Sequence, residues 1–229
     1  MGDADRMLTI LSDEQGLIRA SAKGVRRLKN KLTGASQLFC YGEFSLFLGR
    51  DYFIINNCEI IEPFSELFND PEKFTYAAHI IKIVNDVCQD GLPSADTLSL
   101  LLNTLFVINK GEKNPMLAIR IFELRLLCIS GYMPSVEKCG VCSLEGVRFS
   151  ANANGLVCEN CSKLLYDSIE ISNGTKSALS HVCTCEKSKL FSFDVSNDVL
   201  IELNEILPAY ILKCFEKKYN TLDFLDLIK

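Results

Sequence analysis

Residues 139–161 read CGVCSLEGVRFSANANGLVCENC and decide how the second part of this chain is organised. Cys139 and Cys142 form one Cys-x-x-Cys turn, and Cys158 and Cys161 form a second one after fifteen intervening residues. Each turn presents two sulfurs to one side of an ion, and two turns complete the tetrahedron that Zn²⁺ prefers. Because four thiolates leave no open coordination position, the pattern predicts a structural zinc site rather than a catalytic one.

Three other interpretations of these cysteines stay open at this level. They are four unrelated core residues, two redox pairs, or a metal site that is often empty. Gly140 frees the backbone of the first turn, and Asn154-Gly155 predicts a tight turn between the two pairs, so the sequence favours the metal site.

The remaining cysteines are interpreted from their surroundings. No apolar run reaches the roughly 18 residues that a membrane span needs, and residues 1–13 lack the basic-then-apolar order of a secretion signal. We therefore expect a cytoplasmic protein without a membrane partner, in which cysteines are core residues or ligands rather than disulfides. His181, Cys183 and Cys185 lack a fourth donor and predict a loop with incidental cysteines. Five further cysteines predict small buried side chains: Cys40, Cys58, Cys88, Cys128 and Cys214.

The first part of the chain has the pattern of β-strands. Short runs rich in β-branched and aromatic residues are separated by turn signals, which predicts a small barrel over residues 1–62. The expected strands cover residues 6–11, 17–22, 38–48 and 52–61. Six aromatic residues lie on or next to the last two, and most are expected in the core: Phe39, Tyr41, Phe44, Phe47, Tyr52 and Phe53.

The pattern becomes helical after Pro63. Apolar residues recur at three- and four-residue steps over 74–88 and 98–108. A third helix is expected to begin after Asn114, to end before Gly131 and to be buried on most sides. Further helices are expected at 196–217 and 221–229. The predicted fold class is therefore α+β, a barrel followed by a helical domain over 63–229 that carries the zinc knuckle at about 136–165.

Charge is distributed unevenly along the chain. The net charge is −5, yet residues 15–42 contain no acidic residue. Local charge governs the encounter with an anion, because salt screens each charge beyond about 10 Å. Six cations therefore form a candidate DNA-binding run, with an ordinary solvated loop as the alternative: Arg19, Lys23, Arg26, Arg27, Lys29 and Lys31.

Motifs for catalysis are missing from the sequence. It has two histidines, no Gly-x-x-x-x-Gly-Lys phosphate loop, no His-Glu-x-x-His and no Gly-x-Ser-x-Gly. The pattern favours a binding protein over an enzyme.

Several stretches matter through their order along the chain. They are Ala22-Lys23-Gly24-Val25-Arg26-Arg27, Gly34-Ala35-Ser36-Gln37, Glu123-Leu124-Arg125-Leu126-Leu127, Gly131-Tyr132-Met133-Pro134 and Gly155-Leu156-Val157-Cys158-Glu159-Asn160-Cys161. Together they resemble the RecO family of bacterial recombination mediators, in register over nearly the whole chain.

The resemblance implies an OB-fold barrel, a helical domain and a zinc knuckle. It implies a nucleoid-associated protein that binds single- and double-stranded DNA, anneals complementary strands and acts with RecR. It also implies loading of the RecA recombinase onto strands coated by single-strand-binding protein. The family's basic loop maps onto Lys23, Arg26, Arg27, Lys29 and Lys31.

The resemblance also implies a second protein contact. Family members bind the acidic C-terminal tail of single-strand-binding protein on the helical domain, where Arg120 or Arg125 is predicted to supply a cation. The plainer alternative is that both arginines pair with Glu123 or other acids.

One departure from the family concerns the start of the chain. Family members usually carry further residues before Gly2-Asp3-Ala4-Asp5-Arg6, and these form the first strand of the barrel. We therefore expect an OB-fold without its first strand, either truncated or left with an exposed edge. The rival functional hypothesis is a zinc-knuckle scaffold for protein contacts that does not bind DNA.

Overall fold

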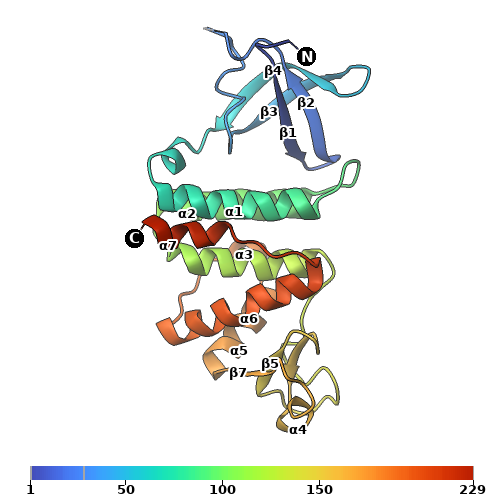
Figure 1. Cartoon of the computed structure of the whole chain (residues 1–229), viewed down its shortest axis with the longest axis vertical. Helices are drawn as coiled ribbons and strands as arrows, with labels where there is room; N and C mark the ends of the chain where they lie inside the picture. Colours follow the sequence, from blue (N-terminus) through green and yellow to red (C-terminus); the bar gives the residue numbers. More distant parts are fainter. Residues whose placement is uncertain (1, 28, 229) are drawn as a thin grey trace.

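The chain forms a stack of layers in the computed structural model, which describes residues 2–27 and 29–228. Figure 1 shows the N-terminal sheet at one end, helices crossing the middle, and a small cysteine-bearing unit at the other end. Leu28 in the basic run and Lys229 in the last predicted helix lie outside the described residues. Among the described residues, no helix combines the length and apolarity that crossing a bilayer requires.

Four strands form the N-terminal sheet, as predicted. They are β1 (Arg6–Ser12), β2 (Gly16–Ala22), β3 (Tyr41–Leu48) and β4 (Phe53–Glu62), in the order β1-β2-β4-β3. β2 and β4 run parallel, whereas the other two pairs are antiparallel. This order leaves β1 and β3 as the edges of the sheet among the described residues.

The third strand begins later than the expected residue 38. Phe39 has φ 67°, which interrupts the extended backbone, and its ring is buried against Phe68 and Phe74 at centroid distances of 5.5 and 5.6 Å. Tertiary packing of this aromatic ring therefore outweighs the local strand preference.

A backbone junction fixes the sheet to the helices. The turn between β1 and β2 meets the α1–α2 connection, where the N–H of Gly91 donates to Gln15 O at 2.8 Å and that of Ser94 to Asp13 O at 2.7 Å. Gly16 has φ 63°, and a Cβ there would lie 2.1 Å from Gln89 O. Only glycine permits this close approach.

Long helices build the middle layers. They are α1 (Pro71–Val87), α2 (Ala95–Lys110), α3 (Pro115–Ile129), α5 (Asn173–Thr184) and α6 (Asn197–Phe215), and the chain closes with the short α7 (Leu225–Ile228). α1 and α2 each begin three residues before the predicted start, because the spacing of apolar residues does not show where a helix is capped. In α1 the side chain of Asp70 caps the first turn by accepting from the backbone N–H groups of Glu72 and Lys73. The prediction of a loop at Cys183 was wrong, since this residue lies in the last turn of α5.

α3 is the central helix and is buried on almost every side, as predicted. It contacts α1, α2, α5 and α6, and residues 117–124 are all buried. Two charged residues lie in this buried stretch. Arg120 Nη1 lies 2.5 Å from Glu123 Oε2, Glu123 Oε1 accepts from His79 Nε2 of α1 at 2.9 Å, and Arg120 Nε donates to Asn204 of α6 at 2.7 Å.

We expect Glu123→Gln to lower the unfolding free energy by about 3–5 kcal/mol at pH 7, because the buried Arg120 then loses its carboxylate. Burial opposes ionisation of Glu123, but Arg120 and His79 outweigh it and hold the pKa of Glu123 below its ordinary 4.5. A lowered folded-state pKa stabilises the fold above pH 4.5, and this contribution is lost as the pH falls through that lowered value. Urea unfolding at decreasing pH should therefore show the variant and the wild type converging.

Asp194→Asn is the matched control. Asp194 pairs with Lys113 at the surface, where its side chain is 69% exposed, so its loss should change stability by less than about 1 kcal/mol. Equal losses in the two variants at pH 7 would contradict the special role of the buried carboxylate.

Candidate metal centre and nucleic-acid interface

Three short strands and one helical turn surround the four cysteines. They are β5 (Arg148–Ser150), β6 (Gly155–Val157), β7 (Ile169–Glu170) and α4 (Glu159–Ser162), with the strands in the order β6-β5-β7. Cys161 lies within α4 and Cys158 directly before it. The predicted Asn154-Gly155 turn is present, with positive φ at both residues. A Cβ on Gly155 would lie 2.4 Å from Ser135 O, so this turn also needs glycine to approach the neighbouring chain.

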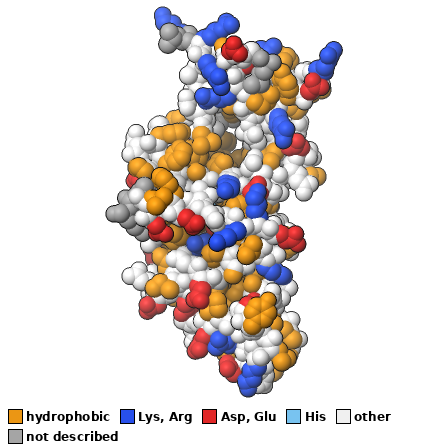
Figure 2. Space-filling model, viewed as in Figure 1, with side chains coloured by type: hydrophobic (Ala, Val, Ile, Leu, Met, Phe, Trp, Pro, Cys, Tyr) orange, Lys and Arg blue, Asp and Glu red, His pale blue; other side chains and the backbone are white. Residues whose placement is uncertain are grey.

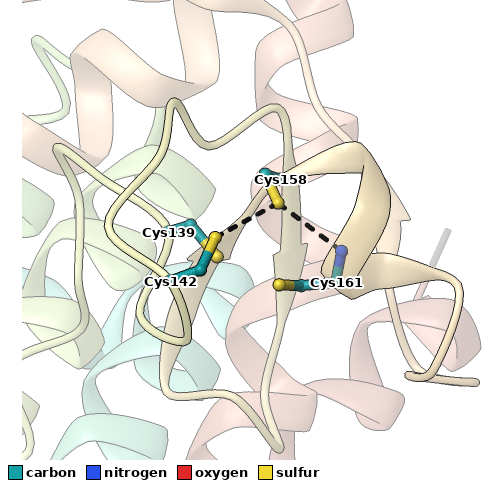
Figure 3. A group of neighbouring side chains, drawn as sticks. All are labelled: Cys139, Cys142, Cys158 and Cys161. Carbon is teal, nitrogen blue, oxygen red and sulfur yellow. Dashed lines mark hydrogen bonds between the residues drawn. The ribbon is translucent and has the colours of Figure 1, made fainter.

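The two cysteine pairs converge on one point. Figure 3 shows their side chains from two chain segments turned toward each other, and the four Sγ atoms all lie within 4.8 Å of one another. Zinc at its usual 2.3 Å from each sulfur would place the sulfurs about 3.8 Å apart. Cys142 and Cys158 Sγ are 3.5 Å apart. These four residues can hold a metal ion, and an all-thiolate tetrahedron fits zinc.

Hydrogen bonds from backbone amides favour the thiolate form of Cys139 and Cys158. Burial opposes ionisation of Cys139, but hydrogen bonds from the backbone of Cys158, Cys142 and Val141 outweigh it and lower the pKa of Cys139 to about 6. The backbone N–H of Cys161 lies 3.5 Å from Cys158 Sγ and lowers the pKa of Cys158. Because a metal binds the thiolate, these amides favour metal binding at Cys139 and Cys158, whereas hydrogen bonds between the cysteine side chains raise the pKa of Cys142 and Cys161.

The cysteine unit has a small apolar cluster of its own, and it also buries Val136, Phe149 and Leu156 in the main core. Its own core consists of Cys139, Val157 and Cys158, with Ala153, Cys161 and Leu165 packed against them. Three of these six residues are prospective ligands. A metal ion would therefore stabilise the part of the unit that carries the cysteines, as in other small metal-binding units.

The basic run lies on the connection between β2 and β3. All six predicted DNA-binding residues are exposed, and none forms an ion pair with a carboxylate in the part of the chain that the structure describes. Arg19 lies on β2, and the other five follow that strand. Figure 2 shows Lys and Arg side chains gathered at the end of the molecule that the N-terminal sheet forms.

Polar contacts fix the backbone of this connection. Asp5 Oδ1 accepts from the N–H of Gly24 at 2.9 Å, and the Asn30 side chain donates to Lys23 O at 3.0 Å and accepts from the N–H of Leu32 at 2.8 Å. Sequence reasoning missed Asp5 and Asn30, since a short polar residue carries no signal without its partner. The cations therefore project from a braced turn rather than from an unconstrained loop.

The predicted aromatic residues divide between core and surface. Phe39 is buried, and Phe44 and Phe53 pack against the small core of the sheet around Ala20, Ala22, Val25, Leu32 and Ile55. Phe47 on the edge strand β3 is half exposed. Phe47 is therefore the exposed ring among these six, and Tyr41 and Tyr52 are half-buried.

The two arginines predicted to bind a partner occupy different environments. Arg120 is 6% exposed and engaged with Glu123 and Asn204, in line with the plainer alternative. Arg125 is half-buried and donates to the carbonyl oxygens of Val182, Cys183 and Cys185 at 2.9–3.1 Å.

Arg125 also lines a groove between α2, α3 and α5. We name this the α2–α3–α5 groove; its volume is about 280 Å³, and its lining includes Leu100, Arg125, Cys128, Ile129, Met133 and Lys187. Lys187 follows Arg125 by 62 positions along the chain, so sequence patterns gave no indication that both line one groove. His181 lies apart from the metal centre, with its ring against Phe193 and Nε2 3.1 Å from Lys189 O.

We expect the purified chain to hold one metal ion and Cys158→Ser to lose it, because three thiolates no longer close the tetrahedron. Chelation should accelerate amide hydrogen exchange within residues 135–165 while β1 and β2 stay protected, since metal binding contributes about 10 kcal/mol to folding of such units. Metal content and exchange by mass spectrometry test both points. Cys88→Ser is the control; it changes a half-buried cysteine at the end of α1 and should retain the metal.

Amide hydrogen exchange in residues 135–165 that chelation leaves unchanged would contradict a structural role of the metal.

Comparisons with known proteins agree with this architecture. The family model "Recombination protein O N terminal" matches residues 1–64, and "Recombination protein O C terminal" matches residues 69–223. The DNA repair protein RecO of Acetivibrio thermocellus is 42% identical over 234 aligned residues, which cover 100% of this chain and 93% of that protein. Those of Desulforamulus reducens and Alkaliphilus metalliredigens are 33% and 32% identical, over 99% and 97% of this chain and 89% and 92% of theirs. The chain belongs to the RecO family of DNA repair proteins.

Proposed function

We propose that this protein is a recombination mediator that binds single- and double-stranded DNA through the basic run and anneals complementary strands. The observation that carries the proposal is the set of six exposed cations, unpaired with described carboxylates and within thirteen positions, on a braced segment. Membership of a DNA repair family supports the same reading. The structural ion at the four cysteines would be zinc.

The proposed mechanism is electrostatic and needs no turnover. Cations that neutralise phosphates release condensed counterions, and this release supplies the free energy of binding. Two DNA strands held on one basic surface repel each other less, because the cations neutralise part of their phosphate charge. The strands can then move until complementary bases are aligned. Base pairing then provides the free energy of annealing, so no residue has to act as a catalyst.

The rest of the molecule would orient the bound strand. Beyond residue 60 the chain carries sixteen Lys/Arg against twenty-two Asp/Glu, a net charge of about −6. An acidic body repels phosphate at short range, so the strand is directed to the N-terminal sheet. The acidic helical part would meet protein partners, which we propose are RecR and single-strand-binding protein during loading of RecA, in the cytoplasm at the nucleoid.

We expect binding of a fluorescent single-stranded oligonucleotide to weaken steeply with salt. Five phosphate contacts predict a log–log slope near −3.5, from about −0.7 per contact. Arg26→Ala/Arg27→Ala/Lys29→Ala should reduce the slope to about −1.4, because about two contacts remain. Fluorescence anisotropy across a salt series measures both slopes.

A matched variant distinguishes the effect of the basic run on DNA binding from the effect of the protein's total charge. Lys82→Ala/Lys110→Ala/Lys218→Ala removes three exposed cations from the helical part and should keep the wild-type slope. Absence of binding by the folded wild type at low salt would favour the rival, a scaffold for protein contacts.

The α2–α3–α5 groove is the site that we propose for the acidic C-terminal tail of single-strand-binding protein. Ile129 and Met133 give it apolar walls, and two cations, Arg125 and Lys187, border it. Lys187 is 61% exposed and pairs with Asp96 at 2.6 Å, an ion pair that a competing carboxylate can exchange. An acidic peptide with an apolar end matches both features.

We expect Lys187→Glu to weaken binding of an acidic C-terminal tail peptide by about tenfold, since charge reversal costs about 1.4 kcal/mol or more at a rim contact. Lys189→Glu is the matched control, because Lys189 lies in the same 3-10 turn but does not line the groove. Isothermal titration of both variants measures the difference. Equal weakening in the two would indicate a general charge effect and reject the groove as the site.

A further inference from the structure

Two cysteines outside the metal centre face each other between α3 and α5. Cys128 lies in the last turn of α3 and Cys183 in the last turn of α5, and their Sγ atoms are 3.6 Å apart. A disulfide needs about 2.05 Å between the sulfurs, so an approach of roughly 1.5 Å would join them. Neither DNA binding nor the metal centre uses this pair.

The pair is open to small reagents. Both cysteines line the α2–α3–α5 groove, where Cys128 is half-buried and Cys183 is 8% exposed. Arg125 lies beside them and donates to the carbonyl oxygen of Cys183 at 3.1 Å. A cation next to a reachable thiol is the environment in which cysteines react with oxidants.

The two thiols differ in acidity. The hydrogen bond with Cys183 lowers the pKa of Cys128 against the opposing effect of burial, and the charge of Arg125 lowers it further. The same hydrogen bond and burial raise the pKa of Cys183. Cys128 is also the more exposed of the two, so it is the thiol that peroxide reaches first, and Cys183 is the thiol that follows.

We propose that Cys128 and Cys183 form a reversible disulfide when the protein meets a peroxide, and that this bond links α3 to α5 across the groove. The inference is independent of the proposed function, since it concerns covalent chemistry of the chain itself.

The chemistry balances in two steps. The Cys128 thiolate attacks hydrogen peroxide, so that an S–O bond forms, the O–O bond breaks and hydroxide leaves. The Cys183 sulfur then attacks the sulfenic sulfur: the S–S bond forms, the S–O bond breaks, and the Cys183 proton leaves with the hydroxyl as water. Overall two thiols are oxidised and one peroxide is reduced to two waters; a dithiol reductant reverses the disulfide.

The disulfide would constrain a large part of the chain. The two residues are 55 positions apart, and the segment between them contains the four cysteines of the metal centre. A link at the base of this segment restricts the unfolded chain and fixes α5 against α3. It also replaces two thiols in the lining of the groove by one covalent bridge.

The test is disulfide mapping of the full, zinc-loaded chain after graded hydrogen peroxide. We expect a peptide containing the Cys128–Cys183 link at peroxide levels that leave the zinc bound, as followed with a chromophoric chelator. Dithiothreitol should remove it. Cys128→Ser should lower the loss of free thiols by two per chain and Cys183→Ser by one, because Cys128 still forms the sulfenic acid, whereas Cys185→Ser and Cys88→Ser should keep the link.

Mapping of the wild type requires no variant, so a folding defect in a serine variant does not weaken the test. Cys183–Cys185 or metal-centre disulfides in place of the Cys128–Cys183 link would overturn the proposal. So would sulfinic acid at Cys128 without any link, because the second thiol would then have failed to reach the first.

Discussion

The carboxylate of Glu123 constrains the rest of this structure, because it is ionised inside a helix that is covered on almost every side. Its partners come from two elements far apart in the chain: His79 from α1 and Arg120 from α3 itself. Arg120 in turn reaches Asn204 of α6. A buried charge that lost one of these contacts would remain uncompensated, so α1, α3 and α6 have to meet in one arrangement. The apolar residues around α3 supply the contact area between the helices. The polar contacts of Glu123 and Arg120 fix how the helices are positioned along one another.

Each end of the molecule is attached to that centre by a different physical device. The N-terminal sheet has a small core and is joined through a backbone junction that only glycine permits at position 16. The cysteine unit has a small apolar cluster around its four thiolates, and it is joined to the centre through Phe149 and Leu156, which are buried in the main core. Both ends are therefore small units that are held against the helices by specific contacts and by a few buried apolar side chains, such as Phe39 and Phe149.

Local patterns were sufficient for much of this fold. Periodicity and caps predicted α3 and its burial, and the two Cys-x-x-Cys turns predicted the convergence of four sulfurs, because both signals lie within short stretches. Contacts between distant residues could not be predicted this way. The pairing of Lys187 with Asp96, the bracing of Lys23 by Asn30 and the approach of Cys183 to Cys128 depend on tertiary packing. The prediction that Phe39 lies in a strand was wrong for the same reason. Its ring packs against Phe74 of α1, a helix that begins 32 positions later.

The basic run of the N-terminal part and the net negative charge of the helical part bear on how such a protein would bind DNA. The cations stand on a braced turn at one end, and the acidic helices lie on the other side of the glycine junction. A bound strand would then touch a small surface and be repelled from the rest, so its affinity would depend on a few phosphates and fall with salt in proportion to their number. Annealing requires this kind of contact, because strands that are searching for register have to move on the surface that holds them. A larger basic surface would bind more tightly and slow that search.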